Sequence, residues 1–136
     1  MCGNKQQSGG QQRFRLGVTA RFSAAHRLPQ HEGKCKELHG HTYKVEVIFE
    51  GEQKENGMVA DFSQLKSVVR DVLEALDHKY LNEVLENPTS ENIAVFILES
   101  VAQLVERKGL GIKVVAVRVW EDEDKWVQVG KGATWR

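Results

Sequence analysis

The 136-residue chain has few cysteines, no excess of charge of either sign and no long hydrophobic run. Its two cysteines, Cys2 and Cys35, argue against a disulfide framework and favour a reducing, cytoplasmic setting. Lys and Arg total 19, as do Asp and Glu, and this zero net charge argues against nucleic acid as the main partner. No apolar run approaches the roughly 20 residues of a membrane-spanning helix, and none resembles a secretory signal. We therefore expect a cytoplasmic protein with neither a membrane nor a nucleic acid as partner.

The length argues for one domain, and a hydrophobic content of 40% is ordinary for a globular chain. Residues 1–12 are rich in Gly, Gln and Ser, so we expect a disordered leader followed by a single domain over residues 13–136.

Two stretches alternate between apolar and polar residues, as half-buried β-strands do. They cover residues 13–26 and 39–50, and a loop over residues 28–38 joins them. We expect the two strands to pair antiparallel, which brings the end of the first beside the start of the second. His26 ends the apolar face of the first strand, and His39 and His41 begin that of the second. Alternation and topology thus bring three histidines together.

The remaining chain predicts two helices and two further strands. Apolar residues at helical spacing predict helices over residues 62–76, after a capping-box spacing from Asp61 to Gln64, and from Thr89 or Ser90 to about Lys108. A nearly continuous apolar run predicts a strand buried on both faces over residues 112–120. A charged turn over 122–125 and a short strand over 126–129 follow. The order ββααββ predicts an α+β fold, an antiparallel sheet with two helices on one face.

Three converging imidazoles are typical of an open zinc site, in which three protein ligands leave one position free for Lewis-acid chemistry. The alternative is three structural or surface histidines. Cys35 lies in a polar loop between Lys34 and Lys36, which favours a partly exposed, reactive thiol. Cys35 could instead be a fourth ligand, which would close the site and make the zinc structural.

Three other groups are candidates for chemistry, each with a simpler explanation. Asp77 and His78 follow the first helix and could form an acid–base pair, or could simply be solvated residues at a helix end. Glu121 ends an apolar strand and could grip an N–H edge of a ligand, or could only begin an acidic hairpin. Thr89, Ser90 and Glu91 open the second helix, where they cap it and could also hold a polar ligand.

Six motifs in order resemble the family of 6-pyruvoyl-tetrahydropterin and 6-carboxytetrahydropterin synthases. The resemblance runs from about Phe14 to about Val129. The motifs are Phe22-Ser-Ala-Ala-His26-Arg-Leu, Cys35-x3-His39-Gly-His41, Met58-Val-x-Asp61-Phe62, Leu76-Asp77-His78-x2-Leu81-Asn82, Pro88-Thr-x-Glu91-Asn92 and Val119-Trp-Glu121. The polar leader and the acidic turn after Glu121 depart from the family pattern.

The resemblance implies the tunnelling fold (T-fold), whose subunits join edge to edge into barrels, commonly a homohexamer built as a dimer of trimers. It implies Zn2+ on His26, His39 and His41, with Cys35 as a catalytic proton acceptor. Asp77 and His78 would form a second acid–base element. Glu121 would anchor the pterin ring, in a pocket lined by Thr89, Ser90 and Glu91.

The short spacing Cys-x3-His-Gly-His resembles the carboxy branch of the family, which serves the queuosine (7-deazaguanine) pathway. The resemblance then implies conversion of 7,8-dihydroneopterin triphosphate to 6-carboxy-5,6,7,8-tetrahydropterin, with release of acetaldehyde and triphosphate. Two alternatives remain: triphosphate elimination alone, which yields 6-pyruvoyl-tetrahydropterin, or a non-catalytic zinc-stabilised module with Cys35 as a ligand.

Overall fold

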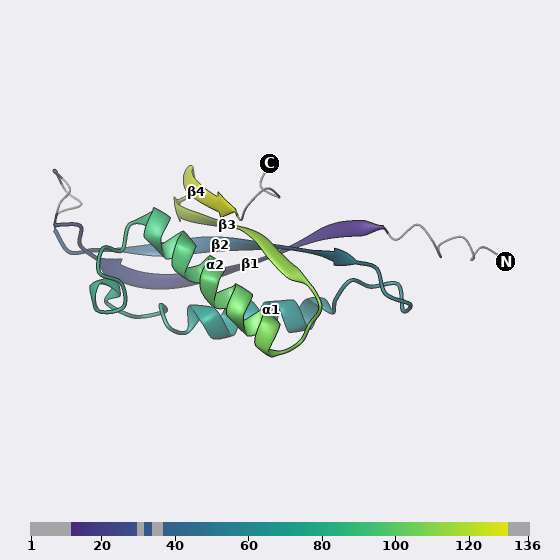
Figure 1. Cartoon of the computed structure of the whole chain (residues 1–136). Coiled ribbons are helices and arrows are strands. Elements are labelled where there is room, and N and C mark those ends of the chain that lie inside the picture. The colour runs from purple at the N-terminus through teal and green to yellow at the C-terminus, as the bar shows by residue number, and fades with distance from the viewer. Residues whose placement is uncertain (1–11, 30–31, 34–36, 131–136) are drawn as a thin grey trace.

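A computed structural model describes residues 12–29, 32–33 and 37–130 of the chain. Within them lie strands β1 (Arg13–His26) and β2 (His39–Glu52), helix α1 (Phe62–Leu73), the short 3-10 helix η3 (Leu81–Glu83), helix α2 (Ser90–Arg107), and strands β3 (Lys113–Asp122) and β4 (Lys125–Gly130). The strands form one antiparallel sheet in the order β1-β2-β3-β4, and both helices lie against the same face of it (Figure 1). The predicted α+β order is confirmed. No helix among the described residues is long and apolar enough to cross a membrane.

The core lies between the sheet and the two helices. Alternate residues of each strand point to the helices, because successive side chains of a strand leave on opposite faces. The register places Val18 opposite Val47, and Val47 opposite Val117, so the buried rows of three strands form one apolar surface. Val114 to Val117 are all buried, which confirms burial on both faces for this part of β3, whereas Lys113 is exposed and Arg118 and Trp120 are half-buried.

Side-chain caps set where the helices begin. Asp61 caps α1 by accepting a hydrogen bond from Ser63 N at 2.8 Å, and Thr89 caps α2 by accepting one from Asn92 N at 3.1 Å. Each cap satisfies a backbone N–H that the helix itself leaves free. The end of α1 was predicted three residues too late. After Leu73 the chain tightens into i→i+3 bonds, among them Leu76 N to Leu73 O at 2.9 Å, so the apolar spacing continues beyond the helix.

The predicted four-residue charged turn over residues 122–125 was also too long. β3 continues to Asp122 and β4 begins at Lys125, so only Glu123 and Asp124 turn the chain. Lys125 Nζ lies 2.9 Å from Asp122 Oδ2 and 3.2 Å from Asp124 Oδ1, and these ion pairs close the hairpin. The leader predicted over residues 1–12 lies outside the described residues, except for Gln12, and so do Cys2 and Cys35.

Candidate metal centre and its cavity

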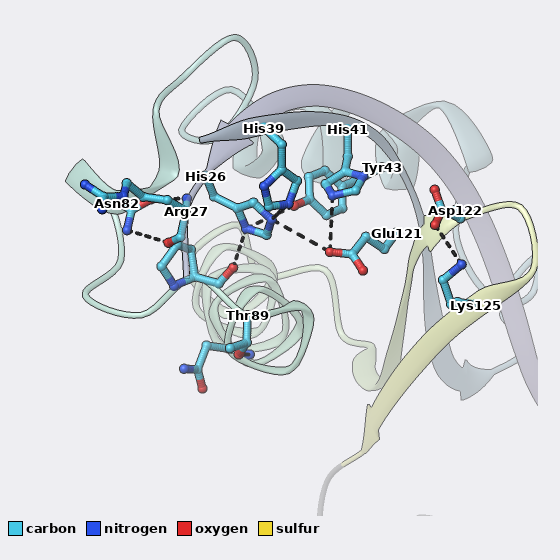
Figure 2. Close-up of polar contacts among 12 residues, drawn as sticks. His26, Arg27, His39, His41, Tyr43, Asn82, Thr89, Glu121, Asp122 and Lys125 are labelled. Atoms are coloured by element: carbon cyan, nitrogen blue, oxygen red, sulfur yellow. Dashed lines mark hydrogen bonds and ion pairs between the residues drawn. The ribbon is translucent and has the colours of Figure 1, made fainter. Parts of the chain in front are cut away.

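The site lies where the apolar rows of the sheet reach the end of the core. β1 and β2 pair so that His26 is directly opposite His39, with His41 two residues further along the same face. Glu121 continues the row of Val117 and Val119 on β3. In Figure 2 the three imidazoles and this carboxylate point toward one another. One potential ligand atom from each lies within 4.8 Å of all the others. The predicted convergence of the three histidines is confirmed.

Backbone carbonyls fix the tautomers of two of these histidines. The Nδ1 atom of His26 lies 2.8 Å from the carbonyl oxygen of Pro88, and that of His39 lies 2.7 Å from the carbonyl oxygen of Glu37. A carbonyl oxygen can only accept, so in each ring Nδ1 carries the proton and donates it. In the neutral form of each ring Nε2 then carries the lone pair, and both Nε2 atoms face the cluster.

Lone pairs that converge in this way favour a cation between them. The Nε2 atoms of His26 and His39 are 3.0 Å apart, and in these neutral tautomers no proton lies between them. His41 Nε2 is buried and makes no hydrogen bond, the one such side-chain atom among the described residues. Glu121 Oε2 lies 3.4 Å from it. Three imidazoles and a carboxylate that converge in this way fit a divalent cation, and this donor set suits zinc.

Burial keeps His26 in the neutral form that a metal requires. Its side chain is fully buried, and this desolvation lowers the pKa of His26 below its usual 6.5. The hydrogen bond to the Pro88 carbonyl and the nearby Glu121 carboxylate act in the opposite direction, and the neighbouring imidazoles of His39 and His41 lower the pKa further. A neutral imidazole near pH 7 offers its lone pair to a metal without first losing a proton.

The Asp77–His78 pair lies beside the outer edge of β1. The Asp77 carboxylate accepts a hydrogen bond from Ser23 N at 2.9 Å and lies 3.1 Å from His78 Nδ1. The bond from Ser23 is the main cause that lowers the pKa of Asp77, and His78 contributes. His78 has a positive φ of 59°, rare for a residue with a side chain, and its backbone N–H bonds to Ser23 O. An ionised carboxylate thus orients an exposed imidazole.

An open cavity of about 1170 Å³ extends from His78 of this pair to His41 of the cluster. Its lining includes both His41 and His78, together with Arg27, Glu37, Lys79 and Tyr80. A second cavity of about 590 Å³ includes His41 and Glu121, and Gly40 and Thr42 border both. Sequence reasoning had not singled out the charged lining residues Arg27, Glu37 and Lys79. Only their closeness to the histidine motifs could have indicated them.

Comparison with known proteins decides the family. The family model described as 6-pyruvoyl tetrahydropterin synthase matches residues 15–131. The chain belongs to this family. A protein of Archaeoglobus fulgidus that carries the provisional name 6-carboxy-5,6,7,8-tetrahydropterin synthase is 48% identical over 84% of this chain and 93% of its own length. The dihydroneopterin monophosphate aldolase of Pyrococcus furiosus is 42% identical over 85% of this chain and 96% of its own length.

The fold agrees with that assignment. The 6-pyruvoyl tetrahydropterin synthase of Caenorhabditis elegans superimposes with a TM-score of 0.78 at 26% identity, over 90% of this chain and 98% of that one. The resemblance to the family found in the sequence is therefore confirmed, and the single subunit has the expected T-fold architecture.

The family resemblance implied ligand-binding roles for Glu121 and for Thr89, Ser90 and Glu91 at the start of α2. Thr89 caps α2, Ser90 begins it and Glu91 is exposed in its first turn, and none of the three lines the two cavities at the cluster. Their role in a pterin pocket stays a prediction. Glu121, expected only as an anchor for the pterin, lies within reach of the metal ligands, which the sequence had not indicated because it does not reveal the register of β3.

Proposed function

We propose that the chain converts 7,8-dihydroneopterin triphosphate to 6-carboxy-5,6,7,8-tetrahydropterin. The balanced reaction consumes one water and releases acetaldehyde and triphosphate. The observation that carries the proposal is the convergence of His26, His39 and His41, with His26 Nε2 and His39 Nε2 3.0 Å apart, beside an open cavity that His78 also lines. Family membership and the spacing Cys-x3-His-Gly-His add the substrate class and the carboxy product.

The three histidines would hold Zn2+. When bound, the ion would supply a Lewis acid that polarises the hydroxyls of the substrate side chain and acidifies the protons on their carbons. Glu121 would receive the N–H edge of the pterin through two parallel hydrogen bonds. Thr89, Ser90 and Glu91 would complete the pterin pocket.

Two groups of the protein would transfer protons. Cys35 would accept the first proton as a thiolate, the nucleophilic and basic form of cysteine. His78, oriented by Asp77, would handle the second. Arg27 and Lys79 line the same cavity and provide positive charge for the phosphates. Outer strands β1 and β4 would pair with other copies in a barrel-forming homohexamer.

A second candidate function comes from the relative in Pyrococcus furiosus. Its name describes an aldolase acting on dihydroneopterin monophosphate, and it is 42% identical to this chain over nearly its whole length. An aldol cleavage of that side chain breaks the bond between its first two carbons and releases glycolaldehyde phosphate and a 6-hydroxymethyl pterin. The same acid–base groups could serve this reaction, so the two candidates differ in the product.

A product assay tests these alternatives. The zinc-loaded protein is incubated separately with 7,8-dihydroneopterin triphosphate and with the monophosphate, and the pterins and aldehydes are identified by mass spectrometry. We expect a 6-carboxy product and acetaldehyde from the triphosphate. A pyruvoyl product would indicate elimination alone, and a hydroxymethyl product would indicate the aldolase. Absence of turnover with zinc bound, together with zinc loss in Cys35→Ala, would favour the non-catalytic module.

A further inference from the structure

His26 is the most enclosed member of the cluster, and two separate parts of the chain hold it. Its side chain is fully buried, whereas those of His41 and Glu121 are 17% and 26% exposed. The ring is held through Nδ1 by the Pro88 carbonyl, and the backbone is held just after the end of β1. Both of these interactions depend on asparagine side chains that have no part in the proposed chemistry.

Asn82 holds the backbone next to His26. Its Oδ1 accepts a hydrogen bond from Arg27 N at 2.9 Å, and its Nδ2 donates one to Arg27 O at 2.9 Å (Figure 2). One side-chain amide thus satisfies both backbone groups of the residue after His26, as a neighbouring strand would. Two residues earlier, Ala25 N bonds to Lys79 O at 3.1 Å. Asn82 therefore completes the pairing that fixes the end of β1.

Asn92 holds the turn that presents the Pro88 carbonyl. Its Nδ2 donates to Asn87 O at 2.8 Å, and its backbone N–H donates to the Thr89 hydroxyl at 3.1 Å. These bonds fix the residues on both sides of Pro88. The direction of the Pro88 carbonyl, and through it the orientation and tautomer of the His26 ring, follows from this turn.

We infer that Asn82 and Asn92 are positioning residues that hold His26 for metal binding, one through its backbone and the other through its ring. The inference rests on the proposed metal site. Groups that orient a metal ligand through its other nitrogen commonly contribute about 10- to 100-fold to metal affinity. Neither asparagine touches the ligand atoms, so their loss should weaken zinc binding without removing a ligand.

The test compares three variants in which an amide becomes a carboxylate of nearly the same shape: Asn82→Asp, Asn92→Asp and the control Asn56→Asp. Asn56 lies in an exposed turn, where its Oδ1 accepts from Met58 N, a bond that aspartate keeps. In the other two variants the Nδ2 donor is lost. The added negative charge would itself favour a cation, so any loss of affinity must come from positioning. Zinc affinity is measured by chelator competition, and geometry by the visible absorption of the Co2+-loaded protein.

We expect zinc affinity to fall about 10-fold or more in Asn82→Asp and Asn92→Asp, with an altered Co2+ spectrum, and to stay within about twofold in Asn56→Asp. Thermal unfolding of the metal-free proteins shows whether each variant folds, and an alanine variant replaces any that does not. Unchanged zinc affinity and Co2+ spectra in both test variants would overturn the inference even if the parent turns over substrate. If both variants bind zinc more weakly than the parent but the parent shows no turnover, the inference stands and the proposed function is overturned.

Discussion

Glu121 lies where its carboxylate can act either as a fourth metal ligand or as a contact for the substrate. Its carboxylate is 3.7 Å from His26 Nε2 and 3.4 Å from His41 Nε2, close enough to complete a four-ligand site or to face the open position of a three-histidine site. Three imidazoles suffice for a catalytic zinc, whose fourth position receives water or substrate. A fourth protein ligand would close that position.

We predict that Glu121→Gln keeps one zinc per chain but loses about 10- to 100-fold in kcat/KM, because glutamine loses the charge and one acceptor, and a hydrogen bond to a charged group is worth about 1.5–3 kcal/mol. Zinc content by atomic absorption and steady-state kinetics on the pterin substrate measure the two effects. Glu106→Gln, an exposed glutamate of α2 that lines neither cavity at the cluster, is the control and should change neither. Loss of zinc from Glu121→Gln would identify Glu121 as a ligand.

Among the elements, β2 contains two glycines with opposite surroundings. A Cβ on Gly51 would lie 2.8 Å from Val59 Cγ1 and 3.1 Å from Ile112 Cγ2, inside the packed core. We predict that Gly51→Ala lowers the free energy of unfolding by about 1–3 kcal/mol, the usual cost of overpacking, as measured by denaturant titration.

Gly40, in the same strand, is the matched control. There the nearest atom to a new Cβ would be Ala24 O at 3.6 Å, which is an ordinary contact, so Gly40→Ala should fold with unchanged stability. Equal destabilisation of the two variants would contradict this explanation. Because Gly40 borders both cavities, its methyl group should instead raise the KM for the pterin substrate.

The elements also show what the sequence could and could not predict. A period of two determines which face a strand residue occupies, so the sequence alone could predict that His26, His39 and His41 lie together. The hydrogen-bond partners of these rings could not be predicted, because the carbonyls of Pro88 and Glu37 are chemically identical to the other backbone carbonyls of the chain. The end of α1 was missed for a related reason, since Leu76 keeps helical spacing while its backbone has already tightened.

At the scale of the whole molecule, folding moves His26 from water into complete burial, and this makes stability depend on pH. The pKa of His26 is lowered in the folded state, chiefly by desolvation. Between the unfolded pKa of about 6.5 and the lower folded pKa, the unfolded chain binds more protons at this site than the folded one. The free energy of unfolding therefore rises with pH in this window, and acid favours the unfolded state.

We predict that the metal-free protein loses stability progressively as the pH falls below about 6.5, and that His26→Gln reduces this dependence because glutamine does not titrate. Denaturant unfolding at several pH values between 7.5 and 5 measures both proteins. Zinc should steepen the dependence in the parent, because protons compete with the metal for imidazole nitrogens, and should have little effect on the variant, which lacks a ligand. A parent whose stability is the same at pH 7 and pH 5 without metal would show that the burial of His26 does not control its protonation.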